Sequence, residues 1–376
     1  MKTAFIFQHY PPFPGAGARR AKSIIKSYVT IQSADMDEFY LLTTEELAVE
    51  SNVEVKNFKH SKEGNKKGFF LRAIEELVLG IKIATHLIHV KKYDRVVLSS
   101  PSYLATIPIS FALFLRRVPY VIELRDIYPE SFVEAGLMSK KSLPYKILKS
   151  ISGKIYSNSI GVLCATDGLI KLLKPYKNLP SVDFVYNGYD LYHESGEITK
   201  YDEFTVCFHG ILGVFQDVEG LVIVADKLNK FGIKLLVIGY GCQEKLLELP
   251  SNIKFLGKKS FEDTMDIVSK CHVGLSLRNN DQISINSFPV KVWEYIGLGI
   301  PCIVSPVSEA GNFVESKGLG RQVNFGDYDE IIKIILEYRE SKDTGSVERD
   351  SLLMYSRKET GMAAANQIVS YFRGEV

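Results

Sequence analysis

The residues with the clearest capacity for chemistry lie in one short stretch, 286–301, which reads NSFPVKVWEYIGLGIP and runs into the apolar segment CIVS. The pattern predicts a polar loop entering a helix near Val290, with Lys291 and Glu294 on one helical face, and then a buried strand. Exposed backbone N–H groups at a helix start, beside a lysine, suit an anion. A carboxylate one turn further along can accept hydrogen bonds from sugar hydroxyls. A phosphate at the helix start and a ribose beside it would thus belong to one ligand. The alternative is that Lys291 and Glu294 form an ordinary surface ion pair.

The rest of the chain alternates short apolar runs with helical patterns. Such alternation predicts an α/β protein whose mostly parallel sheets carry helices on both faces. The expected strands are Lys2–Gln8, Glu38–Thr43, Val53–Phe58, Asp94–Ser99, Pro119–Leu124, Ile160–Ala165, Ser181–Tyr186, Thr205–Gly210, Lys234–Gly239, Ile253–Leu256, Val273–Leu277, Ile300–Ser305 and Gly320–Val323. The expected helices of the first half are Ala18–Ile31, Lys67–Val90, Tyr103–Arg117, Leu143–Asn158 and Asp167–Leu173.

Two domains fit a chain of 376 residues. The strand pattern restarts after a polar stretch at 193–203, which we interpret as a linker. We therefore expect one Rossmann-like domain at 1–192, a second at 204–349, and a final helical segment at 350–376 that packs back on the first domain. The carboxyl ends of the strands would line a shared cleft, where ligands of doubly wound sheets bind.

Two loops of the first domain carry polar groups at such strand ends. The first strand leads to Gly15 and Gly17, which allow close backbone approach, and then to the basic pair Arg19 and Arg20. This loop lacks the GxGxxG of a dinucleotide site, and a simple tight turn explains it as well. The strand at 119–124 ends in RDIYPES, which places Arg125 and Asp126 at the cleft edge. Asp126 could instead be the N-cap of a helix that begins near Pro129.

Glycines follow two strands of the second domain. Gly239 and Gly241 come between a strand and a helix expected at 243–249, and Gly257 ends the next strand. If these turns lie side by side, they could admit a flat base between backbone edges.

Composition excludes several classes of function. The net charge of +2 argues against nucleic acid as a partner. The five cysteines lie in apolar runs without a CxxC pair, as is typical of reduced core residues. No apolar run reaches the roughly 20 residues of a membrane span, and the run after Met1 ends too early for a secretory signal. His86 and His89 lack an apparent third ligand, so no metal site is predicted and both are expected on a polar face or in the core.

The order of these motifs resembles the family 4 retaining glycosyltransferases of the GT-B fold over nearly the whole chain. The matching residues are Gly15 and Gly17, the turn Tyr186–Asp190, His209 and Gly210, Gly239 and Gly241, Phe255–Gly257, and Pro289–Pro301. Within that family, ELRDIYPES at 123–131 and FPVK at 288–291 look like the bacterial branch that builds O-antigen, capsule and exopolysaccharide, including the N-acetylfucosamine transferases.

This resemblance implies a role for each matching residue. Glu294 would hold the donor ribose; Lys291 and the amides near Val290, with Ser287 and Pro289 before them, would hold the diphosphate. Gly239, Gly241 and Gly257 would border the base, and Gly15 and Gly17 the phosphates or the transferred sugar.

The sequence departs from the family pattern twice. Asn286 stands where the family has the first of two glutamates, and segment 211–219 contains no basic residue where an arginine and a lysine usually neutralise the diphosphate. The diphosphate charge would then rest on Lys291, the helix amides and Arg19, Arg20 or Arg125.

The implied reaction is sugar transfer with retention from a nucleotide-diphosphate donor, a UDP-sugar above all, without a metal or other cofactor. The leaving diphosphate would be stabilised electrostatically and would deprotonate the incoming hydroxyl. Asp126 is the candidate for orienting the acceptor or the reacting sugar, and Arg125 for supporting charge. The acceptor would be a lipid-linked saccharide, and the protein is expected in the cytoplasm, with the inner face of the cytoplasmic membrane as its place of contact.

Two basic and apolar stretches, 66–92 and 140–154, could lie on an anionic membrane as peripheral contacts. We expect most of their apolar residues to pack on the sheet, leaving only the basic rims for lipid. Two other functions stay open: a non-catalytic GT-B protein that binds nucleotide sugar or a partner transferase, and an epimerase that acts on a UDP-sugar without an acceptor.

Overall fold

The structure is a computed structural model that describes residues 1–13, 15–32, 37–45, 52–58, 69–89, 92–100, 102–190, 199–248, 252–341 and 349–375. The chain divides into two compact units. Unit 1 comprises Met1–Asn187 and Arg357–Val376, and unit 2 comprises Gly188–Ser356. Much of the expected linker lies outside the described residues.

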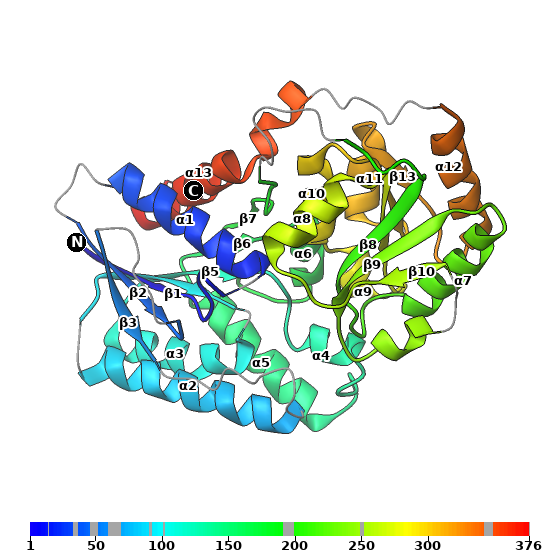
Figure 1. Ribbon diagram of the computed structural model, residues 1–376. Helices are drawn as coiled ribbons and strands as arrows, with labels where there is room; N and C mark the ends of the chain where they lie inside the picture. Colours follow the sequence, from blue (N-terminus) through cyan, green and yellow to red (C-terminus); the bar gives the residue numbers. More distant parts are fainter. Residues whose placement is uncertain are drawn as a thin grey trace. The chain divides into compact units, whose positions relative to one another are not determined.

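Unit 1 is built on a parallel sheet of seven strands in the order β3-β2-β1-β4-β5-β6-β7 (Figure 1). The strands are β1 Lys2–Ile6, β2 Glu38–Thr43, β3 Val53–Asn57, β4 Arg95–Ser99, β5 Tyr120–Leu124, β6 Gly161–Cys164 and β7 Val182–Phe184. The helices are α1 Ala16–Gln32, α2 Phe69–His89, α3 Tyr103–Arg116, α4 Glu130–Glu134, α5 Leu143–Ser157, α6 Asp167–Leu173 and α13 Arg357–Arg373.

Helices cover both faces of this sheet, which is why β4 and β5 are buried at every residue and read as continuous apolar runs. Helices α1 and α13 cover one face, and α2 and α3 the other (Figure 1). The last helix therefore packs on the first domain, as predicted. The contact between α1 and α13 is close, because the Ser23 hydroxyl donates to the Arg357 carbonyl at 2.7 Å and a Cβ on Gly361 would lie 2.0 Å from that hydroxyl.

Unit 2 repeats the architecture with six parallel strands in the order β10-β9-β8-β11-β12-β13. The strands are β8 Thr205–Ile211, β9 Lys234–Tyr240, β10 Ile253–Phe255, β11 Val273–Leu277, β12 Cys302–Ser305 and β13 Gly320–Gln322. The helices are α7 Val218–Asn229, η1 Glu244–Glu248, α8 Phe261–Ser269, α9 Gln282–Ile285, α10 Val290–Leu298, α11 Glu309–Ser316, α12 Tyr328–Ser341 and η2 Arg349–Tyr355.

All the expected strands are present in the two sheets, so the doubly wound α/β prediction is confirmed. One cysteine differs from expectation. Cys164, Cys207, Cys271 and Cys302 are buried, but Cys242 is exposed because it lies in the turn after β9.

Candidate functional site

The polar groups of unit 2 gather at the carboxyl edge of its sheet. Strands β8 and β9 approach so closely there that a Cβ on Gly239 would lie 1.9 Å from the Gly210 carbonyl oxygen. Gly241 is constrained in the same way by the Leu212 carbonyl oxygen, at 2.2 Å. The Gly239 amide donates to the Gly257 carbonyl at 3.0 Å, so the two glycine turns do lie side by side, as expected. Close backbone approach thus requires glycine at 239 and 241 whether or not a base binds beside them.

Lys291 lies in the first turn of α10 and points toward the end of β8. Pro289 occupies the N-cap position and Val290 is the first helical residue. The Lys291 side chain is only 8% exposed; its Nζ donates to Gln216 Oε1 at 2.8 Å and lies 3.5 Å from the centroid of the Phe208 ring. Burial lowers the pKa of Lys291 well below its ordinary value, the charge of Arg278 lowers it further, and Glu294 opposes both.

Glu294 follows one turn later and is also buried, at 6% exposure. Its Oε2 lies 3.7 Å from Nδ1 of His209, and the His209 ring packs edge-on against Tyr295. Because Lys291 and Glu294 are both buried, the alternative of an ordinary surface ion pair is wrong. A buried cation and a buried carboxylate instead lie one turn apart at the sheet edge, which suits a phosphate with an attached ribose.

Arg278 belongs to the same edge and was not among the residues predicted from the sequence. It follows β11 directly, and its guanidinium donates from Nη1 to Ser287 Oγ at 2.8 Å and from Nε to Ser284 Oγ at 3.2 Å. Position after a buried strand, the criterion that selected Arg125, would have found it. Ser287 thus orients Arg278. Asn286 donates its side-chain amide to the Gln282 carbonyl at 2.8 Å.

In unit 1, Gly17 and Arg125 are brought into contact. A Cβ on Gly17 would lie 1.5 Å from Nη1 of Arg125, so the guanidinium occupies the space that glycine leaves open. Gly15, by contrast, has a φ of 129° and open space around its α-carbon. Burial lowers the pKa of Arg125, while the charges of Glu123 and Asp126 raise it.

Arg20 is engaged by partners within unit 1, which offset its charge. Its Nε donates to Glu123 Oε1 at 2.7 Å in a fully buried ion pair, and Ser99 Oγ donates to the other carboxylate oxygen at 2.6 Å. Nη1 of Arg20 donates to the Val185 carbonyl at 2.8 Å. Arg20 therefore joins α1 to β5 and to the segment after β7.

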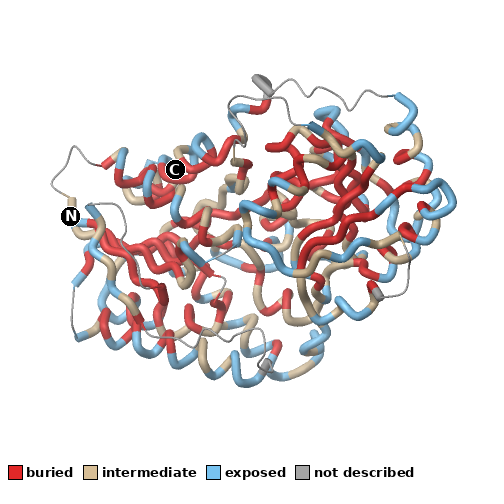
Figure 2. Tube along the Cα trace, viewed as in Figure 1, coloured by how far each residue is buried: buried red, intermediate tan, exposed pale blue. Residues whose placement is uncertain are grey.

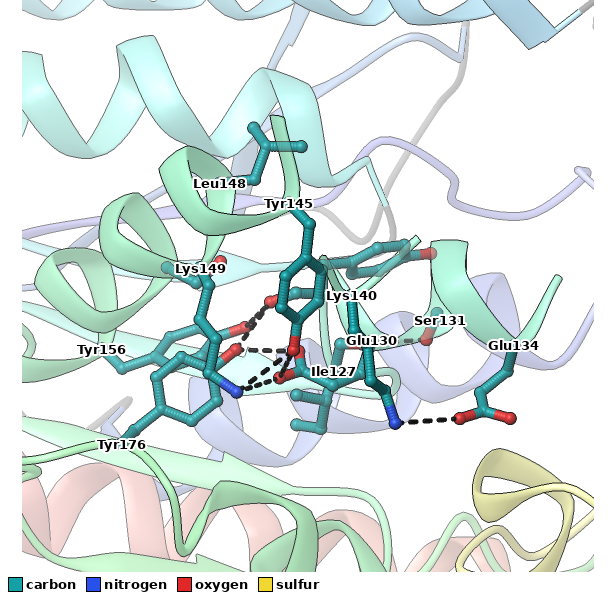
Figure 3. A network of polar contacts seen from close by, with 12 residues as sticks. Ile127, Glu130, Ser131, Glu134, Lys140, Tyr145, Leu148, Lys149, Tyr156 and Tyr176 are labelled. Atoms are coloured by element: carbon teal, nitrogen blue, oxygen red, sulfur yellow. Dashed lines mark hydrogen bonds and ion pairs between the residues drawn. The ribbon is translucent and has the colours of Figure 1, made fainter. Parts of the chain in front are cut away.

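Asp126 is not the N-cap of the following helix, because Pro129 holds that position in α4. Glu130 instead anchors the loop that carries Asp126 (Figure 3). Tyr176 donates its hydroxyl to Glu130 Oε2 at 2.8 Å, and Lys149 donates Nζ to Oε1 at 2.9 Å. The Tyr176 hydroxyl also lies 3.1 Å from the Tyr128 carbonyl. The carboxylate thus holds the turn after β5 against α5.

A small cavity opens at the carboxyl ends of β1, β2 and β4, between α2 and α3. Its lining is mainly apolar and includes several polar side chains; it is formed by Ile6, Gln8, Leu42, Thr43, Thr44, Leu79, Ile83, Leu98, Ser99, Ser102, Ala105, Thr106 and Ile109. The buried Ser102 hydroxyl makes no hydrogen bond within the described residues. The cavity and the loops of Gly15 and Asp126 lie at the same sheet edge.

Helix α2 is apolar on two sides, which corrects the expectation that its apolar residues pack on the sheet. Leu79, Ile83 and Leu87 do pack on the sheet. A second stripe, with the same helical spacing, faces outward and consists of Phe70, Leu71, Ile74, Leu77, Val78 and Ile81, each at least 42% exposed. Figure 2 shows this outer side of α2 as exposed.

Neither a metal cluster nor a membrane span is found in the part of the chain that the structure describes. No group of three or more His, Cys, Asp or Glu side chains there could hold a metal, and none of the helices there is long and apolar enough to cross a membrane. His86 is buried against Tyr93, whose hydroxyl lies 3.0 Å from its Nε2, so of the two expected positions, a polar face or the core, it occupies the core.

No protein-family model and no curated protein sequence matches the chain. Solved structures do match it. Anabaena HepE, in complex with UDP and glucose, is 15% identical, has a TM-score of 0.63, and the match covers 100% of this chain and 98% of that one. WaaG, a glycosyltransferase involved in lipopolysaccharide biosynthesis, is 13% identical, with a TM-score of 0.64 over 99% and 98% of the two chains. A putative UDP-N-acetylglucosamine 2-epimerase from Listeria monocytogenes is 11% identical, with a TM-score of 0.56 over 100% and 96%. The fold is therefore GT-B, two Rossmann-like domains in tandem.

Proposed function

We propose that this protein is a retaining hexosyltransferase that takes a sugar, an N-acetylated amino or deoxy sugar, from a UDP-sugar donor. The observation that carries the proposal is the pair Lys291 and Glu294, buried one turn apart at the carboxyl edge of the unit 2 sheet. A cation and helix amides suit the diphosphate, and a carboxylate suits the ribose. The complex of HepE with UDP on the same fold supports this reading.

The remaining residues divide between the two substrates. Ser287, Pro289 and Val290 shape the start of α10 at the diphosphate, and Gly239, Gly241 and Gly257 border the base. On unit 1, Gly15 and Gly17 approach the phosphates or the transferred sugar, Asp126 orients the acceptor hydroxyl or the reacting sugar, and Arg125 supports charge. No cofactor is needed, because the leaving diphosphate is stabilised by Lys291 and the helix amides and itself takes the proton of the incoming hydroxyl.

The proposed acceptor is a lipid-linked saccharide used in bacterial surface polysaccharide synthesis, as in the family 4 branch that the RDIYPES and FPVK motifs resemble. The outward stripe of α2 supports this acceptor, because an exposed apolar helix face of this size suits an interface with lipid. Peripheral binding at the inner face of the cytoplasmic membrane would bring the acceptor to unit 1.

Ligand-induced stabilisation tests the donor. Purified protein is melted with UDP, GDP, ADP, CMP and dTDP, with and without Mg²⁺, since a ligand that binds only the native state raises the melting temperature. A metal-independent rise with UDP alone is expected, and the matching UDP-sugar should then be consumed in the presence of lipid-linked saccharide. If none of the nucleotides raises the melting temperature, the proposed donor site is refuted.

Vesicle sedimentation tests the acceptor surface. Vesicles rich in anionic lipid should bind the wild type, and Ile74→Ser with Ile81→Ser should reduce binding. Ile223→Ser, at an exposed apolar residue of α7 in unit 2, is the matched control. Equal binding of both variants would exclude the α2 stripe.

An epimerase is the second candidate, because a putative UDP-N-acetylglucosamine 2-epimerase has the same fold over the whole chain. Product formed from the UDP-sugar alone, without acceptor, would favour it over the transferase. Tight nucleotide binding with no turnover under either condition would favour a non-catalytic binding protein.

A further inference from the structure

Two cations of unit 2 are connected through one residue. Gln216 accepts a hydrogen bond from Lys291 Nζ at 2.8 Å through its side chain, and its backbone forms an antiparallel bridge with Arg278. Lys291 comes from the first turn of α10, and Arg278 from the loop after β11. The backbone around Gln216 thus fixes the position of both cations at the carboxyl edge of the sheet.

The Arg278 side chain extends toward the loop that leads into α10. Its Nε donates to Ser284 and its Nη1 to Ser287, and its Cζ lies 5.9 Å from the centroid of the Phe215 ring. A guanidinium has five N–H donors in a planar fork that matches the oxygens of a phosphate. Two of the nitrogens donate to serine hydroxyls, which carry no charge of their own.

The electrostatics of the pair favour an anion. Lys291 is buried with an amide oxygen and an aromatic ring as its neighbours, and the positive charge of Arg278 further lowers its pKa. In this buried surrounding the charge of Arg278 opposes protonation of Lys291 more strongly than it would in water. A ligand with adjacent negative charges relieves this repulsion and gains from both cations.

We infer that Arg278 is the second cation of the diphosphate subsite, together with Lys291. The inference rests on the proposed function. Arg278 would supply the positive charge that segment 211–219, which has no basic residue, does not. The ligand class is the diphosphate of a nucleotide sugar, and the residue acts from the strand end after β11 instead of the loop after β8.

The test compares UDP affinity by calorimetry in wild type, Arg278→Gln and Arg278→Lys at several salt concentrations. Loss of a charge-assisted contact should weaken UDP binding by roughly 10- to 100-fold in Arg278→Gln. Arg278→Lys keeps the charge without the fork and should give an intermediate affinity. The salt dependence of binding should also become weaker in Arg278→Gln, because one fewer charge contacts the ligand. Arg339→Gln, which removes an exposed arginine on α12, is the matched control and should bind as wild type.

The outcomes separate the inference from the function on which it rests. If wild type binds no nucleoside diphosphate, the proposed function fails. If wild type binds UDP and Arg278→Gln binds it within twofold, the function stands and the inference is overturned. A weakened Arg278→Gln that keeps the wild-type salt dependence also overturns it, because Arg278 would then only support Ser284 and Ser287.

Discussion

The guanidinium of Arg125 lies in the space where any other residue at position 17 would place its Cβ. The distance from that Cβ position to Nη1 of Arg125 is 1.5 Å, although 108 positions separate the two residues (125 − 17). Gly17 is in the first turn of α1, and Arg125 follows β5 directly. The glycine loop and the RDIYPES loop of unit 1 are therefore in contact, and the position of the Arg125 guanidinium depends on the absence of a side chain at Gly17.

Gly17→Ala should displace Arg125 and lower transfer activity roughly 10- to 100-fold, the scale expected when a catalytic group moves by about 1 Å. The protein should still fold, because the atoms in the way are the far end of a flexible side chain and alanine suits a helix. Steady-state kinetics measure the loss of transfer activity, and thermal melts check that the variant still folds. Gly153→Ala, in the middle of α5 with only an ordinary 3.6 Å contact to Tyr176, is the control that should keep full activity. Wild-type kinetics in Gly17→Ala would refute the role of Arg125.

Glu130→Ala should destabilise the loop between β5 and α5. The substitution removes the carboxylate that accepts hydrogen bonds from Tyr176 and Lys149, and both donors are left without this acceptor in a half-buried network (Figure 3). Loss of these bonds should reduce the free energy of unfolding by about 1–3 kcal/mol, measured by urea denaturation. The rate of sugar transfer should fall as the loop is destabilised. The affinity for UDP should not change, since the network lies in unit 1.

Glu134→Ala is the matched control in the same helix. Its ion pair with Lys140 is longer, at 3.6 Å, and the lysine is 57% exposed, so its loss should change stability by less than about 1 kcal/mol. Equal effects of the two substitutions would show that the Glu130 network stabilises the loop no more than the exposed Glu134–Lys140 pair does.

The regular elements were predictable because their signals are local. Parallel strands covered on both faces are apolar throughout, so β4 and β5 could be identified from a few residues each. The burial of α2 was not predictable, since its inner and outer stripes have the same helical spacing and only the position of the sheet distinguishes them. Sequence periodicity reports that a helix has an apolar face, not which neighbour covers it.

The chemistry of single arginines depends on distant partners and was predicted less well. From the sequence, both Arg20 and Arg125 were predicted as cations that could contact the diphosphate. In the structure Arg20 forms a buried ion pair with Glu123, which is 103 positions away in the sequence. Arg278 could have been selected by its position after a strand, but its relation to Lys291 arises only when Gln216 joins the two loops. Lys291 and Glu294 could be paired from the sequence since one helical turn separates them.

The affinity for UDP should fall as pH rises through the lowered pKa of Lys291. In the free protein, burial favours the neutral amine, so the pKa lies well below its ordinary value. A bound diphosphate favours the ammonium and raises the pKa again, so binding takes up a proton at any pH between the two values. Calorimetry of UDP binding above pH 7, where the phosphates stay ionised, should show weaker binding at each higher pH.

Lys291→Arg is the control for that pH dependence, because a guanidinium keeps its charge across the range. Its UDP affinity should be lower than that of wild type at pH 7 but nearly constant with pH. If both proteins lose affinity in parallel, the titrating group is not Lys291.

Glu294→Gln and Asp126→Asn should separate donor binding from transfer. Glu294 is buried beside Lys291 in unit 2, so loss of its charge should weaken UDP binding by roughly 10-fold or more, the effect of one charge-assisted hydrogen bond. Asp126 lies in unit 1 beside Arg125, so its amide variant should bind UDP as wild type and transfer sugar roughly 100-fold more slowly. Asp329→Asn should alter neither quantity, because the Asp329 side chain is 86% exposed and pairs with Lys227 on the surface. The paired measurement of UDP affinity and turnover decides the assignment: the donor belongs to unit 2 only if the Glu294 variant loses affinity, and the reacting groups belong to unit 1 only if the Asp126 variant loses turnover alone.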